Sequence, residues 1–174
     1  MPNPAENAII TDMAEATHAH HQKFVLQTVQ PALAGLMDGS VSTLAPIFAA
    51  AFATHSPHTT LLIGISAATG AGISMAFAEA LSDDGSVTGR GKPWRRGLII
   101  GAMTFLGGIF HTLPFLLPSI HAALILAYIV VGCELIIIAA IRYRFFSMSF
   151  WLSCLQVIVG GGLVFLAGIL IGQA

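Results

Sequence analysis

Long apolar segments are the feature that most restricts what this chain can fold into. They cover residues 31–53, 59–81, 97–117, 121–141 and 150–172. A helix needs about 20 such residues to cross the hydrocarbon core, where every backbone polar group must be satisfied within the protein. The runs are continuous and lack the alternation of barrel strands. With 56% hydrophobic and 9% charged residues, the chain is predicted to be an all-α integral membrane protein of five transmembrane helices.

Positive charges collect on one side of the predicted spans. The linkers after the second and fourth spans hold Arg90, Lys92, Arg95, Arg96, Arg142 and Arg144. Lys and Arg in such linkers favour the cytoplasmic side. We therefore expect a cytoplasmic N-terminus and, after an odd number of spans, a C-terminus outside. Residues 1–30 lack the basic start of a signal peptide and should form an uncleaved, polar, His-containing cytoplasmic segment before the membrane domain, 31–174.

The charge balance excludes one class of partner. Seven Lys or Arg against eight Asp or Glu give a net charge of −1, which leaves no basic surface for nucleic acid phosphates. Cys133 and Cys154 both lie in apolar runs and are interpreted as small hydrophobes.

Small residues recur at helical spacing within the spans, as at Gly35 and Gly39, and let helices approach closely in lipid. Because five spans cannot divide into two inverted halves, a homodimer would supply the missing symmetry.

Asp38 lies well inside the first span, where a charged Asp costs about 2.5 to 3.5 kcal/mol near a helix centre. An intramembrane carboxylate is by default a functional group, here an ion ligand or a proton carrier. The alternative is a structural Asp hydrogen-bonded to Ser40, Ser42 or a backbone carbonyl.

Met75 and Glu79 are four residues apart in the second span and share one helical face. A thioether beside a carboxylate suits Fe²⁺ or Mn²⁺ better than Ca²⁺ or Mg²⁺. The alternatives are that Met75 only packs among apolar side chains and that Glu79 extends to the membrane–water interface.

Three further residues are secondary candidates for polar or proton sites. Glu134 in the fourth span is either a proton site or a polar anchor between helices. Met103 and His111 lie two turns apart in the third span and could extend a polar route outward.

Glu15 and His18 have the Glu-x-x-His spacing of di-iron helical bundles, and His20 and His21 add nitrogen donors. A closed di-iron centre needs carboxylates from several helices, and this segment supplies only one helix. The segment is interpreted either as a site of weak cytoplasmic metal capture or as a solvated polar stretch before the first span.

Four segments together resemble the vacuolar iron transporter family over roughly residues 30–173. They read QPALAGLMDGSVSTLAPIFAAAFATH, GAGISMAFAEALSDDGSVTGRGKPWRRG, LGGIFHTLPFLLP and QVIVGGGLVFLAGILIG. The sequence is most similar to the membrane half of bacterial membrane-bound ferritins, in which a ferritin-like or erythrin domain precedes the transporter. The resemblance implies a dimer of five-helix subunits that moves Fe²⁺ along its two-fold interface, in exchange for protons.

The resemblance also implies roles for particular residues. Asp38 and Met75 would face the pathway, and Glu79 would stand near its cytoplasmic mouth. The eukaryotic members insert a Glu-rich helical domain between spans two and three, whereas this linker offers only Asp83 and Asp84 for metal capture. Residues 1–30 contain no counterpart of the ferritin-like domain, so no oxidase or storage activity is expected.

The sequence therefore predicts a bacterial inner-membrane exporter of Fe²⁺, with Mn²⁺ as a further substrate, and no enzyme. No tightly bound cofactor is expected. The alternative is a non-conducting membrane anchor or assembly subunit for a ferritin-like partner.

Overall fold

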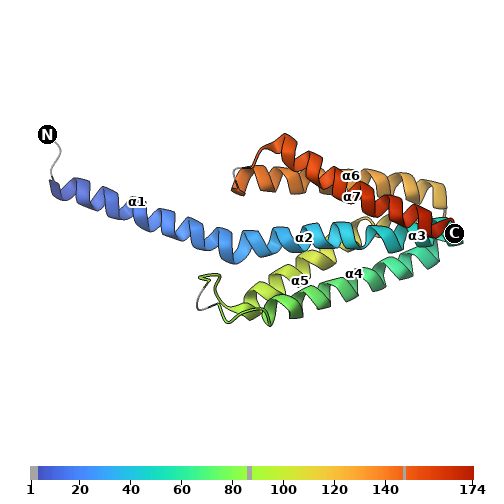
Figure 1. Ribbon diagram of the computed structural model, residues 1–174, viewed down its shortest axis with the longest axis horizontal. Helices are drawn as coiled ribbons and strands as arrows, with labels where there is room; N and C mark the ends of the chain where they lie inside the picture. The colour runs from blue at the N-terminus through green and yellow to red at the C-terminus, as the bar shows by residue number, and fades with distance from the viewer. Residues whose placement is uncertain (1–3, 86–87, 147) are drawn as a thin grey trace.

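The computed structural model describes residues 4–85, 88–146 and 148–174, which are 86% helix with no strand. The elements in chain order are α1 (Pro4–Phe24), the π-helix η1 (Val25–Val29), α2 (Gln30–Ser42), α3 (Leu44–Thr54), α4 (Pro57–Ala80), α5 (Pro93–Phe110), the 3-10 helix η2 (Leu113–Leu116), α6 (Ile120–Phe146) and α7 (Phe150–Gly172). The helices from α2 to α7 lie along one long axis, and α1 projects from one end (Figure 1). The predicted all-α class is confirmed for the described residues.

The predicted first span is the last part of a much longer helical rod. α1, η1, α2 and α3 follow one another with only Thr43 between α2 and α3. Pro46 has no N–H to donate to the Ser42 carbonyl, and α2 ends at Ser42. The N-terminal segment, whose fold the sequence left open, is helical from Pro4 onward.

Among the residues that the structure describes, four helical stretches are long and apolar enough to cross a membrane. They are Asp12–Thr54, Pro57–Ala80, Ile120–Phe146 and Phe150–Gly172. The remaining predicted span, the third in chain order, corresponds to α5, which has 18 residues and carries Arg95 and Arg96 in its first turn. It ends at Phe110 because Pro114 cannot donate to the Phe110 carbonyl. The helix expected over 97–117 is thus shorter than predicted, and a turn and η2 follow it.

α5 is held between α2 and α4 by close backbone contacts. A Cβ atom added at Gly35 would collide with the carbonyl of Ile100, and one at Gly39 with that of Thr104. Only glycine permits this approach. The expectation that small residues join the helices is confirmed at these positions.

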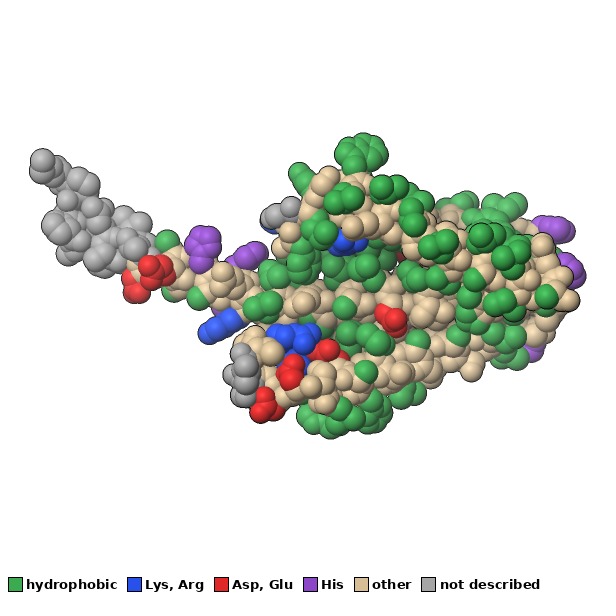
Figure 2. All heavy atoms as spheres, in the orientation of Figure 1, with side chains coloured by type: hydrophobic (Ala, Val, Ile, Leu, Met, Phe, Trp, Pro, Cys, Tyr) green, Lys and Arg blue, Asp and Glu red, His purple; other side chains and the backbone are tan. Residues whose placement is uncertain are grey.

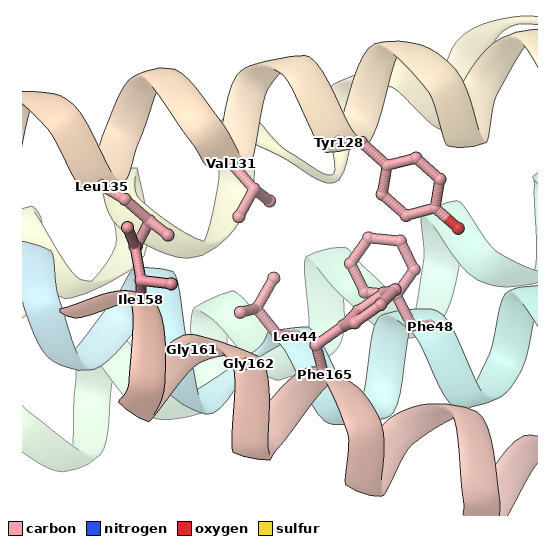
Figure 3. Close-up of a pocket in the computed structure, with 9 residues that line it drawn as sticks. All are labelled: Leu44, Phe48, Tyr128, Val131, Leu135, Ile158, Gly161, Gly162 and Phe165. Atoms are coloured by element: carbon pink, nitrogen blue, oxygen red, sulfur yellow. The ribbon is translucent and has the colours of Figure 1, made fainter. Parts of the chain in front are cut away.

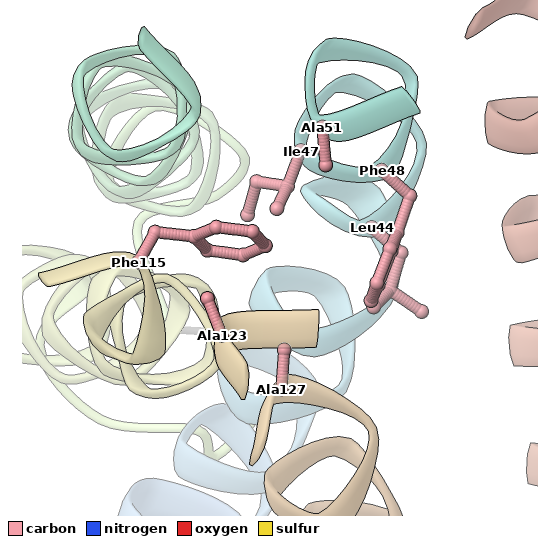
Figure 4. Packing of buried hydrophobic residues seen from close by; sticks show 7 residues of the cluster. All are labelled: Leu44, Ile47, Phe48, Ala51, Phe115, Ala123 and Ala127. Atoms are coloured by element: carbon pink, nitrogen blue, oxygen red, sulfur yellow. The ribbon is translucent and has the colours of Figure 1, made fainter. Parts of the chain in front are cut away.

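The described residues include an apolar cluster at the far end of the bundle, beneath η2. Phe115 of η2 lies between Ile47 of α3 and the small Ala123 and Ala127 of α6 (Figure 4). η2 therefore closes the bundle here with an aromatic ring, and short side chains on α6 let the helices meet around it.

Charge divides the two ends of the bundle, while its sides are apolar. The basic end, where α1 joins, contains Lys23, Arg90, Lys92, Arg95, Arg96, Arg142 and Arg144, which are all the Lys and Arg residues of the chain. At the opposite end, His55 follows α3, His58 lies at the start of α4 and His121 at the start of α6. Figure 2 shows histidine side chains gathered at this end. Large exposed apolar side chains, such as Ile73 and Ile125, cover the flanks between them. Such an apolar belt matches the hydrocarbon core of a bilayer.

Candidate functional site

Asp38 is half-buried on α2, about a quarter turn around the helix from the glycine face that packs on α5. Its neighbour Gly39 packs on Thr104 of α5, whereas Asp38 makes no hydrogen bond or ion pair with any residue that the structure describes. The hydrogen-bonded structural role considered from the sequence is therefore not seen within the described chain. Asp38 is thus a carboxylate well inside a predicted span, without a hydrogen-bond or ion-pair partner among the described residues.

Two uncovered stripes of small side chains flank this position. On α2, Ala34 and Ser42 are exposed at four residues before and after Asp38. On α4, Ser66, Gly70 and Ser74 are exposed at the same spacing, and a Cβ at Gly70 would meet no atom within 4 Å. We call these residues the α2 stripe (Ala34, Asp38, Ser42) and the α4 stripe (Ser66, Gly70, Ser74). Such stripes are typical of helix contacts in membranes.

Met75 and Glu79 follow the α4 stripe toward the basic end, and both are half-buried. The Met75 thioether lies one helical turn from the Glu79 carboxylate, as predicted from their spacing. Glu79 is not an open ligand, however. Its Oε1 atom accepts a hydrogen bond from Arg96 Nε at 2.7 Å and forms an ion pair with Arg90 Nη2 at 2.9 Å.

Asp83 completes an ion-pair cluster with these groups. Its Oδ1 accepts from Arg96 Nη2 at 2.9 Å, and its Oδ2 lies 3.6 Å from Arg90 Nη1. Arg96 is fully buried and also donates to the Gly91 carbonyl at 3.1 Å. The two carboxylates and two guanidinium groups balance in charge. A metal ion that binds Glu79 Oε1 or Asp83 would compete with an arginine. Sequence reasoning missed these arginine partners. Asp84, beside them, is exposed.

His111 and Glu134 form a buried polar group with Thr43. His111 Nδ1 lies 3.0 Å from Glu134 Oε2, and His111 Nε2 lies 2.8 Å from the Thr43 hydroxyl. The Thr43 hydroxyl in turn lies 2.8 Å from the Gly39 carbonyl, to which it donates. Glu134 Oε1 is buried and has no hydrogen-bond partner within the described chain. From the sequence, His111 was expected to share a polar route with Met103, and no partner was predicted for Glu134. The structure instead pairs His111 with Glu134.

Met103 belongs to an apolar cluster instead. It packs with Leu33, Leu36 and Ile138, so it does not extend the polar group at His111. An apolar cavity of about 220 Å³ lies between α3, α6 and α7, lined by residues such as Phe48, Tyr128 and Gly162 (Figure 3). Its walls carry no carboxylate, imidazole or thioether that could bind a cation.

The N-terminal candidates lie on α1, outside the bundle. Glu15, His18 and His21 are exposed and share one side of the helix. In the described ranges, no three His, Cys, Asp or Glu side chains are placed to hold a metal ion. A single chain therefore assembles no complete metal site there. Cys133 and Cys154 are both free thiols.

Long apolar helices with an apolar belt between two polar ends are the features of an integral membrane protein. The sequence pattern of the VIT family, the vacuolar iron transporters, matches residues 80–173, more than half of the chain, and the protein belongs to this family. Members of the family transport metal ions across membranes and are not enzymes. No curated protein and no solved structure matches the chain.

Proposed function

We propose that this protein exports Fe²⁺, with Mn²⁺ as a second substrate, from the bacterial cytoplasm across the inner membrane in exchange for protons. The observation that carries the proposal is Asp38, an unpartnered carboxylate midway along α2. Intramembrane carboxylates of this kind are costly to insert and mark ion or proton pathways.

The chemistry of the two predicted ligands favours a transition metal. Asp38 offers hard oxygen and Met75 offers a soft thioether, a combination suited to Fe²⁺ or Mn²⁺ rather than Ca²⁺ or Mg²⁺. Two such groups are too few to replace the water around a divalent ion. A second copy related by a two-fold axis would double them, with one Asp38 and one Met75 from each subunit.

The uncovered α2 and α4 stripes support this dimer. They present Ala34, Ser42, Gly70 and other small side chains that nothing in the single chain covers. Two copies can bring such surfaces into close contact in lipid. Ion passage along this interface places Asp38 beside its symmetry mate, so the paired carboxylates attract a cation more strongly than one does.

The orientation of the protein in the membrane is inferred from the basic end of the bundle. Lys and Arg residues accumulate on the cytoplasmic side, which puts the Glu79–Asp83 cluster at the inner mouth. Arriving metal would compete there with Arg90, which is about a quarter exposed and therefore the more mobile of the two arginines.

The test is Fe²⁺ flux into liposomes that carry the purified protein, under an imposed pH gradient. We expect gradient-dependent flux for the wild type, none for Asp38→Ala, and normal flux for the matched control Asp12→Ala, whose carboxylate is exposed on α1. Full flux in Asp38→Ala, with a folded protein, would remove Asp38 from the pathway.

The second candidate function is a non-conducting anchor for a ferritin-like partner. It is favoured by α1, which projects from the bundle with Met13 and Phe24 about half or more exposed. The same liposomes distinguish the two functions, because an anchor moves no metal in the absence of a partner.

A further inference from the structure

The protonation of the His111–Glu134–Thr43 group follows from its hydrogen bonds. The Thr43 hydroxyl has one hydrogen, which it donates to the Gly39 carbonyl. It can therefore only accept from His111, so Nε2 of the ring carries a hydrogen. One further proton then lies between His111 Nδ1 and Glu134 Oε2, which are 3.0 Å apart. The pair is either imidazolium with carboxylate or neutral imidazole with carboxylic acid.

The remaining oxygen of Glu134 is a vacant proton acceptor. Oε1 is buried and unpartnered within the described chain. A buried acceptor without a hydrogen bond is costly, and a carboxylate accepts more than one hydrogen bond. A proton added at Oε1 gives the pair a net charge of +1, and loss of the shared proton gives −1. The group can thus gain or lose a proton without any change in its other partners.

The geometry points to the His111–Glu134 pair as the proton-binding site of metal exchange, an inference that rests on the proposed function. The proton adds to an oxygen or ring nitrogen of the pair and later leaves from the same atom, so no other reactant is needed. The pair is separate from the metal ligands, since it joins α5 to α6 while Asp38 and Met75 lie on α2 and α4.

Thr43 gives this pair a direct connection to the metal pathway. It is the single residue between α2 and α3, where the helical rod is interrupted. Its hydroxyl bonds both His111 and the Gly39 carbonyl, and Gly39 follows Asp38 directly. A change in the charge of the imidazole therefore acts on the last turn of α2, which carries Asp38. Such a break is where a helix can bend at low cost.

No other ionisable side chain of the described residues is bonded to the pair. Those on the surrounding elements are Asp38 on α2, His55 after α3, His58 and Glu79 on α4, Arg95 and Arg96 on α5, His121, Tyr128, Cys133, Arg142, Tyr143 and Arg144 on α6, and Cys154 on α7. The pH response of the pair is therefore set mainly by its own two members and by the charge at Asp38.

The test compares two kinds of flux in Glu134→Gln. Its amide can still hydrogen-bond His111 but cannot bind or release a proton. We expect loss of Fe²⁺ uptake driven by a pH gradient, with Fe²⁺–Mn²⁺ exchange across equal pH retained. Asp12→Asn on α1 is the matched control and should keep both. Proton-driven uptake that survives in Glu134→Gln overturns the inference, as does loss of both fluxes in a folded dimer. Absence of gradient-driven flux in the wild type overturns the proposed function instead.

His111→Gln provides a second readout if Glu134→Gln does not fold. The proton-driven flux of the wild type should depend on pH. His111→Gln can keep a hydrogen bond to Thr43 but removes the imidazole from the pair, so the profile should shift or flatten. A purely structural pair would lower flux equally at every pH, and an unshifted profile overturns the inference.

Discussion

Arg96 is a fully buried cation whose partners come from three separate positions in the chain. It binds Glu79 at the end of α4 and both Asp83 and the Gly91 carbonyl in the loop that follows. Its guanidinium therefore fixes the loop against the first turn of α5. The net contribution of a buried ion pair is small, but the loss of one partner leaves a buried charge uncompensated. Arg96 thus has a structural role: it holds the α4–α5 loop in place at the proposed cytoplasmic entrance of the pathway.

Replacement of Arg96 tests this role. Arg96→Ala should lower the free energy of unfolding by about 3 to 5 kcal/mol, because Glu79 and Asp83 lose their shared buried partner. SDS titration in mixed micelles measures the change. Arg95→Ala is the matched control, since Arg95 is exposed beside it, and should unfold like the wild type. Equal stability of the two variants would show that Arg90 alone holds the carboxylates.

At the scale of helices, glycine contacts decide which elements can pack together. α2 and α5 meet at Gly35 and Gly39, and α2 carries Asp38 about a quarter turn around the helix from this contact. Packing of the glycine face therefore fixes the direction in which Asp38 projects. The position of Asp38 therefore depends on two glycines, Gly35 three residues before it and Gly39 one residue after it.

Gly39→Ala should disturb this helix contact directly. The new methyl group would overlap the Thr104 carbonyl, and overpacking of this kind costs about 1 to 3 kcal/mol. Gly132→Ala on α6 meets no atom within 4 Å and should be neutral or slightly stabilising, because alanine is the better helix former. The same SDS titration compares them. Unchanged stability of Gly39→Ala would mean that α2 and α5 separate without cost.

For the whole molecule, local patterns were sufficient for the helices but not for the polar contacts between them. Apolar runs of about 20 residues predicted the helical elements. The end of the third span was predicted wrongly, at residue 117 instead of Phe110, because Pro114 interrupts the helix. Glu79 and Arg96 are 17 residues apart, and Thr43 and His111 are 68 apart. No periodicity connects such positions, so their pairing emerges only when the helices pack.

The proposed pathway needs two copies of Asp38, so disruption of the dimer should stop transport. Gly70→Trp places a large ring on the α4 stripe, where a Cβ meets open space in the single chain, so the chain should still fold. In a dimer that closes on this stripe, the ring has no room. We expect cross-linking in liposomes to show monomers and Fe²⁺ flux to be lost. Gly132→Trp, which also projects into open space but from α6, should keep the dimer and the flux. A dimer that persists with normal flux in Gly70→Trp would place the two-fold contact on another face and leave each Asp38 to act alone.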